Sequence, residues 1–198
     1  MDYEIIVVND GSTDRTLKAI SPYQDYYKTQ PPSLRIIKLK QNRGIGQAAN
    51  EGIKASLGRY IVRVDSDDYI HERMLEIEYL YLSMNKDFDA VGCDYLEVDE
   101  LENVIERKNF DKRPLACGIM FRRDRLIDIG LYDPEFELLE DEDLRIRFLE
   151  KYNIHRIPLP LYRYCRHDNE ITKDLPRLQS YIDKLENKHP FLKTIPLG

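Results

Sequence analysis

The chain contains 198 residues, of which 42% are hydrophobic and 33% charged, a balance typical of a globular protein with a sizeable core. This length suits one domain, or one domain with a short tail. The formal net charge of −6 argues against binding to nucleic acid, and no apolar run approaches the roughly 18 residues that a membrane-spanning helix needs.

Three cysteines, Cys93, Cys117 and Cys165, are widely spaced and include no C-x-x-C pair. This spacing favours reduced thiols packed in the core and argues against a zinc site. The first residues lack the basic region of a signal peptide. We therefore expect a cytoplasmic protein, with peripheral contact to the cytosolic face of a membrane as the alternative.

The first third of the chain alternates strands and helices. Apolar, β-branched runs predict strands at 4–8, 34–39 and 60–64. Helices are predicted from 12 to 20 and from 47 to 57, and a loop rich in proline and tyrosine at 21–33. This alternation predicts a parallel sheet covered by helices.

The remaining elements follow by the same rules. Helices are predicted at 71–84, 124–129 and 139–152, and strands at 90–98, 115–121 and 159–164. A peripheral helix is predicted at 173–188. The polar stretch 95–112 is expected to be irregular and to contribute to the acceptor side of a site.

Three carboxylates, Asp65, Asp67 and Asp68, directly follow the strand predicted at 60–64. Like charges this close repel each other and lose hydration on burial, unless a cation or hydrogen-bond donors gather their oxygens. Mg²⁺ and Mn²⁺ prefer such ligands, and ligands bind at the carboxyl ends of strands in open α/β sheets. The alternative is a solvated acidic turn that caps the next helix.

Two turns, 9–14 and 42–46, could bind a nucleotide. Asp10, at the end of the first strand, could accept a hydrogen bond from a base or a ribose, or Asp10 and Asp14 could only shape the turn. In the second turn, Asn42 and Gly44 precede a helix whose N-terminus favours an anion. An ordinary tight turn explains the second segment equally well.

Two further polar segments come late in the chain. In the acidic run 140–143 one carboxylate could be a general base, or the run could simply be the charged first turn of a helix. In the segment 163–168, Arg166 could pair with phosphate oxygens and His167 could bind a metal. Surface charge is the alternative for this segment.

In their order and spacing these segments resemble the motifs of the inverting glycosyltransferases of family 2, over residues 3–172. Residues 6–14 are similar to VVDDGSTD, 42–60 to N-x-G…A-x-N-x-G-I…A-x-G-x-Y, 65–68 to D-x-D-D, 118–136 to FRR…GGFDE, 140–147 to ED-x-DL-x-x-R, and 160–168 to PLYRYRRHD.

The resemblance implies a GT-A fold, a Rossmann-like α/β architecture with a mixed sheet flanked by helices, over residues 1–172, followed by a peripheral helix and tail at 173–198. It also implies roles for individual residues. Asp10 would contact the base, Asp14, Asn42 and Gly44 the donor, Asp65 the ribose or metal, and Asp67 Mn²⁺ or Mg²⁺, with His167 as a further metal ligand. Asp141 would be the general base, Glu140 and Asp68 supporting residues, and Arg166 a diphosphate contact.

The chain departs from the family pattern in two places. The family usually begins with a strand and turn of the type VSVIIPTYN, so we expect an N-terminally truncated domain with an open slot between the strands at 4–8 and 60–64. A strand from a second copy could fill this slot in a homodimer. Ala49 replaces an arginine that many relatives carry.

These features predict a metal-assisted, inverting glycosyltransferase of polysaccharide biosynthesis. It would move a sugar from a nucleoside-diphosphate sugar, with a UDP-sugar favoured, to a glycan or lipid-linked acceptor. One alternative is an inactive domain that only binds nucleotide sugar. The other is a nucleotidyltransferase on a related fold, which would need a glycine-rich basic loop after the first strand, and no such loop precedes Asp10.

Overall fold

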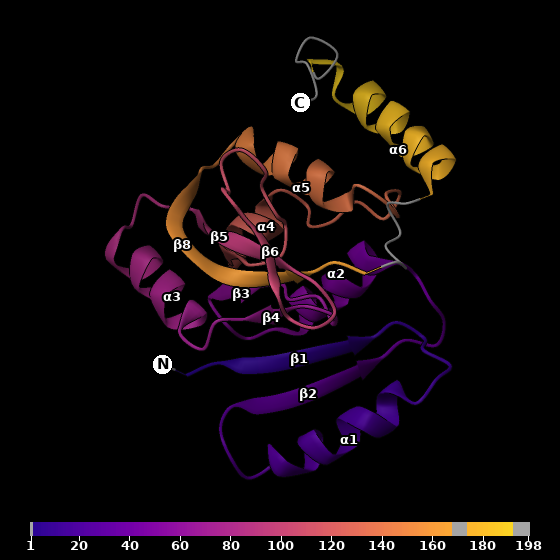
Figure 1. The fold of residues 1–198 in the computed structure, drawn as a ribbon, viewed down its shortest axis with the longest axis vertical. Helices are drawn as coiled ribbons and strands as arrows, with labels where there is room; N and C mark the ends of the chain where they lie inside the picture. The colour runs from indigo at the N-terminus through magenta and orange to yellow at the C-terminus, as the bar shows by residue number, and fades with distance from the viewer. Residues whose placement is uncertain (1, 168–173, 192–198) are drawn as a thin grey trace.

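The computed structural model describes residues 2–167 and 174–191 (Figure 1). Its elements are β1 (Glu4–Asn9), α1 (Thr16–Tyr26), β2 (Ser33–Lys38), α2 (Ile45–Ala55), β3 (Tyr60–Val62), β4 (Tyr69–Ile70), α3 (Met74–Met84), β5 (Ala90–Val98), β6 (Val104–Lys108), β7 (Ile119–Arg122), α4 (Arg123–Asp128), α5 (Glu140–Leu149), β8 (Ile154–Cys165) and α6 (Leu175–Lys188).

The strands form two separate sheets. Strands β1 and β2 pair in parallel, from Glu4 opposite Ser33 to Asn9 opposite Lys38. The larger sheet has six strands in the order β3-β7-β5-β8-β4, with β6 paired to β5. Within it only β5 and β8 run parallel, so the predicted mixed α/β architecture is confirmed.

The parallel pairing predicted from the alternation is present between β1 and β2 but does not extend to β3. Strand β3 lies in the larger sheet and runs antiparallel to β7, whereas β1 pairs only with β2 among the described residues. Figure 1 shows the β1–β2 layer with α1 on its outer side, away from the larger sheet. Alternation of strands and helices predicts the elements, but not which strands pair, because pairing is decided by contacts distant in sequence.

Several element boundaries also differ from the prediction. Helix α1 continues to Tyr26 through part of the predicted loop, with Pro22 inside it. A proline removes one helical hydrogen bond, which weakens a helix without always ending it. Strand β6 lies in the stretch expected to be irregular. Its apolar residues Val104 and Ile105 are both exposed, so the strand lacks the alternation of apolar and polar residues that predicts a half-buried strand.

The two faces of the larger sheet carry separate hydrophobic clusters. Along β7, Ile119 and Phe121 pack on the cluster that includes Phe148 of α5, and Met120 between them packs on the cluster that includes Met74 of α3. This is the alternation that a strand covered on both faces must have. The core packing predicted for Cys93 and Cys117 is confirmed, since both are buried free thiols, whereas Cys165 is half-buried.

Helix α6 lies against α5, at the opposite end of the molecule from α1 (Figure 1). Its residue Leu185 packs in a third cluster with Phe136 and Ile146. The predicted helix start at Lys173 lies outside the described residues. Among the helices of 2–167 and 174–191, none is long and apolar enough to span a membrane. The division into a domain at 1–172 and a tail at 173–198 stays a prediction.

Candidate functional site

The acidic turn after β3 is fastened to β8 through Asp68. The hydroxyl of Tyr162 donates a hydrogen bond to Asp68 Oδ2 at 2.8 Å, and the Cys165 amide donates to Oδ1 at 2.8 Å. The Asp65 amide in turn donates to the Tyr162 oxygen at 3.2 Å. Burial raises the pKa of Asp68 to about 6, against the lowering effect of these hydrogen bonds. Asp68 therefore holds the turn in place.

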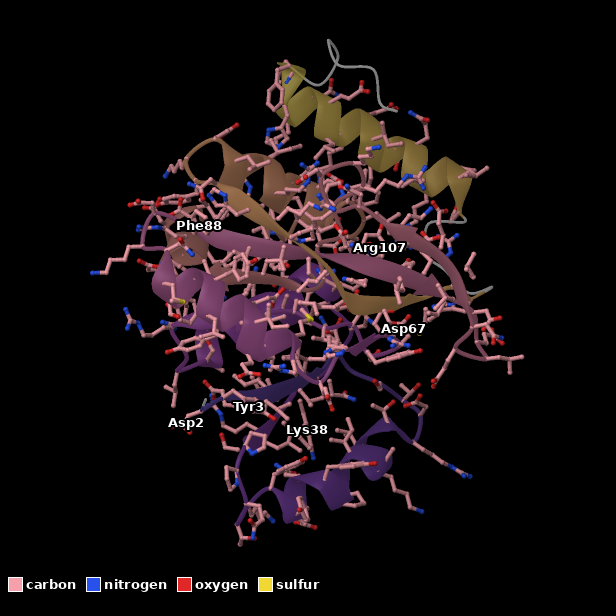
Figure 2. The ribbon with its side chains drawn as sticks, turned by 60° about the vertical axis from the view of Figure 1, so that its left-hand side comes forward. Asp2, Tyr3, Lys38, Asp67, Phe88 and Arg107 are labelled. Atoms are coloured by element: carbon pink, nitrogen blue, oxygen red, sulfur yellow. The ribbon has the colours of Figure 1, made fainter. Side chains whose placement is uncertain are left out.

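Asp67 projects from this turn towards solvent. Its side chain is 51% exposed, and its Oδ2 lies 2.9 Å from His167 Nε2. Figure 2 shows Asp67 at one end of the larger sheet, away from Phe88, which precedes β5. The structure thus brings together two residues that are 100 positions apart and were both predicted as metal ligands.

The donor atoms near the turn fit a hard divalent cation. Asp65, Asp68 and Cys117 each offer a ligand atom within 4.8 Å of the others. Both oxygens of Asp68 already accept hydrogen bonds, and burial raises the pKa of the Cys117 thiol above its ordinary value. By their chemistry the carboxylates of Asp65 and Asp67 and the imidazole of His167 suit Mn²⁺ or Mg²⁺, and the structure places Asp67 beside His167, whereas Asp65 groups with Asp68 and Cys117.

A half-buried arginine, Arg63, joins this turn to the start of α5. Its guanidinium lies 3.1 Å from Asp65 Oδ1 and 3.2 Å from Glu140 Oε1. It also donates to Cys117 Sγ at 3.1 Å and lies over the Tyr132 ring, 5.6 Å from the centroid. Sequence reasoning missed Arg63. The available signal was a lone charge within the apolar run 60–64, directly before the acid cluster.

The four acids that open α5 have four different environments. Glu140 is buried, and burial together with the charge of Asp141 raises its pKa to about 7, while Arg63 opposes that rise. Glu142 pairs with Arg145 at 2.5 Å on the helix surface. Asp143 is fully buried and ion-paired. The residues therefore do not form a uniformly solvated first turn.

Asp141 is the one acid of this turn that forms no ion pair within the described part of the chain. It is half-buried, and its Oδ1 accepts a hydrogen bond only from the neighbouring Glu142 amide, at 2.9 Å. Glu140, Glu142 and Asp143 each pair with a cationic side chain, which leaves Asp141 as the acid of this turn that has no cationic partner among the described residues.

The two turns predicted to bind nucleotide pack directly on each other. Asp10 accepts hydrogen bonds from the Arg43 amide at 2.9 and 3.0 Å and from the Gly44 amide at 2.8 Å. A Cβ on Gly11, whose φ is +73°, would lie 2.6 Å from the Asn42 nitrogen. Asp10 therefore orders both turns, while a carboxylate has about four acceptor positions and can still accept a further donor.

Other residues of these turns act locally. Asp14 is exposed and accepts from the amide and hydroxyl of Thr16, which together lower its pKa. Asn42 Oδ1 accepts from the Gly44 amide at 3.1 Å, and Gly44, with φ +86°, directly precedes α2. The turn-shaping alternative thus accounts for Asp14 as the structure shows it.

The start of α2 packs closely against the start of α5. A Cβ on Gly46 would lie 3.3 Å from Tyr132 and 3.5 Å from Glu140. The Asn50 side chain donates to the Tyr132 carbonyl at 2.8 Å and accepts from its amide at 2.9 Å. This close approach brings the second turn to the carboxylates of α5, although no ion pair or hydrogen bond among the described residues links Asp10 or Asp14 to the turn 65–68.

A cleft of about 350 Å³ adjoins the acidic turn. Asp67, Arg166 and His167 line one side, and the tip of the β5–β6 hairpin, with Asp99, Glu100 and Glu102, lines the other. Arg166 is 44% exposed and lies 3.8 Å from Glu97. Arg107 anchors the hairpin by donating to the buried Asp94 at 2.8 Å. The hairpin falls within the stretch expected on the acceptor side.

Comparison with known proteins agrees with this architecture. EpsJ, an uncharacterized glycosyltransferase of Bacillus subtilis, is 39% identical over 87% of this chain and 55% of its own length. The crystal structure of S. aureus TarS 1-349 in complex with UDP-GlcNAc superposes with a TM-score of 0.72 at 22% identity, over 87% of this chain and 52% of that one. The mannosyltransferase PcManGT from Pyrobaculum calidifontis, in complex with GDP-Man and Mn²⁺, superposes with a TM-score of 0.69 at 16% identity. The match covers 98% of this chain and 55% of that one.

The chain spans about half the length of these three proteins. Residues 1–140 match Glycosyl transferase family 2, which is most of the 198 residues. The resemblance predicted from the motifs is thereby confirmed, and the GT-A fold with it. The chain belongs to glycosyltransferase family 2.

Proposed function

We propose that this chain transfers a sugar from a nucleoside-diphosphate sugar to an acceptor hydroxyl, with inversion at the anomeric carbon and with Asp141 as general base. The observation that carries the proposal is the environment of Asp141. It is the acid in the first turn of α5 that is left without an ion pair within the described residues, while Glu140, Glu142 and Asp143 are all paired. A carboxylate held at a fixed place with a free oxygen can accept a proton.

In the proposed reaction the acceptor oxygen attacks the anomeric carbon from the face opposite the diphosphate. As the new C–O bond forms, the hydroxyl proton passes to Asp141, and the bond between the anomeric carbon and the diphosphate oxygen breaks. The electron pair of that bond leaves with the diphosphate. Attack opposite to the leaving group inverts the configuration, and it needs the base and the diphosphate on different sides of the sugar.

The chain supplies the diphosphate side from the turn 65–68 and the end of β8. Asp65, Asp67 and His167 would hold Mn²⁺ or Mg²⁺, and such a cation would neutralise the charge that develops on the leaving diphosphate. Arg166 would contact the diphosphate as a second cation, because its guanidinium lines the same cleft as Asp67. Arg63 pairs with both Asp65 and Glu140 and would thereby link the diphosphate side of the site to the side of the base.

For the donor, a UDP-sugar is proposed, with the base over the paired turns and Asp10, Asn42 and Gly44 beside it. The complexes of TarS with UDP-GlcNAc and of PcManGT with GDP-Man support a nucleotide-sugar donor without choosing between the two bases. The acceptor is proposed to be a glycan or a lipid-linked sugar that enters beside the β5–β6 hairpin. Three free cysteines are in keeping with a cytoplasmic enzyme.

Calorimetric titration with UDP and with GDP, each with and without Mn²⁺, tests the donor site first. Metal-dependent binding of one nucleotide is the expected result. Release of the nucleoside diphosphate from the matching donor sugar then tests turnover, and the anomeric configuration of the product tests inversion. Binding without turnover would favour the inactive nucleotide-sugar-binding domain, and pyrophosphate release from a nucleotide and a sugar phosphate would favour the nucleotidyltransferase.

A further inference from the structure

Helix α6 lies beyond the residues that match the family, yet it is attached to the segment that carries Asp141 (Figure 1). Its attachment consists of ion pairs to the loop 133–137 before α5, namely Arg177 with Glu137 at 2.7 Å, Lys184 with Glu135 at 3.3 Å and Lys188 with Asp133 at 2.6 Å. Lys184 and Lys188 also lie over the ring of Phe136, each 5.0 Å from its centroid. All these contacts reach the chain just before α5.

The same helix also reaches into the first turn of α5. Asp143 is fully buried, and its Oδ1 lies 2.6 Å from Lys188 Nζ and 2.9 Å from His189 Nε2. Arg147 pairs with its other oxygen at 2.8 Å. Burial alone would raise the pKa of Asp143, but hydrogen bonds from Lys188 and His189, with the charge of Arg147, hold it below its ordinary value. Asp143 is therefore a charged anchor, two residues from Asp141.

The start of α5 needs such an anchor because its own sequence does little to hold it. Leu139, the residue before the helix, has a φ of +59°, a left-handed conformation that is unfavourable for leucine. Its side chain forms no capping hydrogen bond, and four adjacent carboxylates repel one another. A backbone in this conformation persists only where surrounding contacts fix it.

We propose that α6 is a strap that positions Asp141 for catalysis, with Lys188 and His189 as its positioning residues. The proposal rests on the role of Asp141 as general base. Neither residue would touch the substrates. They act by holding Asp143 and the loop 133–137, so that the carboxylate of Asp141 faces the acceptor hydroxyl in one orientation. A displacement of about 1 Å in a reacting group can lower a rate by about a hundredfold.

The test compares two lysines in the full chain. Lys188→Met keeps an unbranched side chain of similar length and removes the charge that pairs with Asp143 and Asp133 and lies over the Phe136 ring. Lys151→Met is the matched control, because Lys151 follows the other end of α5 and pairs with an aspartate, Asp128, at 3.0 Å. Lys188→Arg restores the positive charge. A second variant, His189→Gln, removes the other contact to Asp143.

For Lys188→Met we expect kcat to fall at least tenfold while KM for the donor stays within about twofold. Amide hydrogen exchange of residues 139–143 should become faster by a similar factor. Lys151→Met should leave both quantities near the wild-type values, Lys188→Arg should recover most of kcat, and His189→Gln should lie between. This split between kcat and KM distinguishes positioning of the base from loss of the fold.

Equal losses of kcat in Lys188→Met and Lys151→Met would overturn the proposal. An unchanged rate of amide hydrogen exchange at 139–143 in Lys188→Met would overturn it as well. A rise in donor KM as large as the fall in kcat would also overturn it. If the wild-type chain binds nucleotide but transfers no sugar, the proposed function fails. The exchange comparison between the two lysine variants still decides whether α6 holds the turn.

Discussion

The two acidic turns of this chain, 65–68 and 140–143, divide their carboxylates in the same way. In each turn one acid is bonded to a segment distant in sequence, Asp68 in the first and Asp143 in the second. A second acid in each turn pairs with Arg63, namely Asp65 in the first and Glu140 in the second. In each, a further acid has no lysine or arginine partner among the described residues, namely Asp67 or Asp141. Repulsion within a cluster is thus relieved by giving each carboxylate a different partner, and the acid left over is the one available to a ligand.

The fastening acids differ in the kind of partner, and their pKa values shift in opposite directions. Asp68 receives neutral donors, a tyrosine hydroxyl and an amide, and burial raises its pKa to about 6. Asp143 is also buried, but Lys188, His189 and Arg147 lower its pKa. At Asp68 the neutral donors do not offset the desolvation of the carboxylate, whereas at Asp143 the contacts that include the cations Lys188 and Arg147 do.

The largest effects are expected from substitution of Asp141 and Asp67, the acids that lack a lysine or arginine partner among the described residues. Asp141→Asn removes the proposed base, so we expect sugar transfer to fall by on the order of 10²–10⁴-fold, with donor binding near normal. Initial rates and calorimetric donor binding measure the two quantities on the same preparation. A large loss of donor affinity would assign Asp141 to the donor side instead.

Asp67→Ala should show the reverse pattern. Because Asp67 is the exposed member of the proposed metal set, its removal should abolish the enhancement of nucleotide binding by Mn²⁺. Titration of nucleotide with and without Mn²⁺ measures this directly. If Mn²⁺ still enhances binding to the variant, another set of ligands holds the cation.

Arg63→Met should weaken both turns together. The variant leaves Asp65 and the buried Glu140 without their shared cation, and breaking a buried ion pair costs about 3–5 kcal/mol. Because Arg63 keeps 17% of its side-chain surface exposed, we expect the lower end of that range for the free energy of unfolding. Denaturant unfolding tests it, with Arg73→Met as control, since Arg73 forms an exposed pair with Glu76. Equal stability of the two variants would show that Arg63 does not join the turns.

The smallest effect is a difference in pH dependence between Asp68→Asn and Asp143→Asn. The folded pKa of Asp68 is raised, so its carboxyl contributes stability that is present below about pH 4 and lost as the pH rises through about 6. The folded pKa of Asp143 is lowered, so its contribution is present above its ordinary value and is lost as the pH falls below it.

The stability of wild type relative to Asp68→Asn should therefore grow as the pH falls from 7 to 4, and that relative to Asp143→Asn should shrink below about pH 4. Unfolding curves of the three proteins at several pH values measure both trends. Parallel curves would mean that the two aspartates do not differ in environment.

The sequence predicted the elements and the candidate residues better than it predicted their pairing. Asp67 and His167 were named as ligands of one metal from separate motifs, and they lie 2.9 Å apart. In contrast, Arg63 was missed because a single arginine in an apolar strand has no local signature. The parallel pairing predicted for the first three strands holds for β1 and β2 but does not extend to β3, whose partner β7 lies about 60 residues away in the chain.

The sequence by itself determined the family, since its motifs occur in one order with one spacing and depend on residue type alone. It also indicated most of the strands and helices, because apolar periodicity is local, but it missed β6. Only the tertiary structure decided which acid has which environment. Whether a carboxylate meets a tyrosine hydroxyl, an arginine or solvent depends on segments that meet through folding, such as Asp143 with His189. The burial and the charges at those tertiary contacts set the pKa of each carboxylate, and the neighbouring residues in the chain do not reveal these contacts.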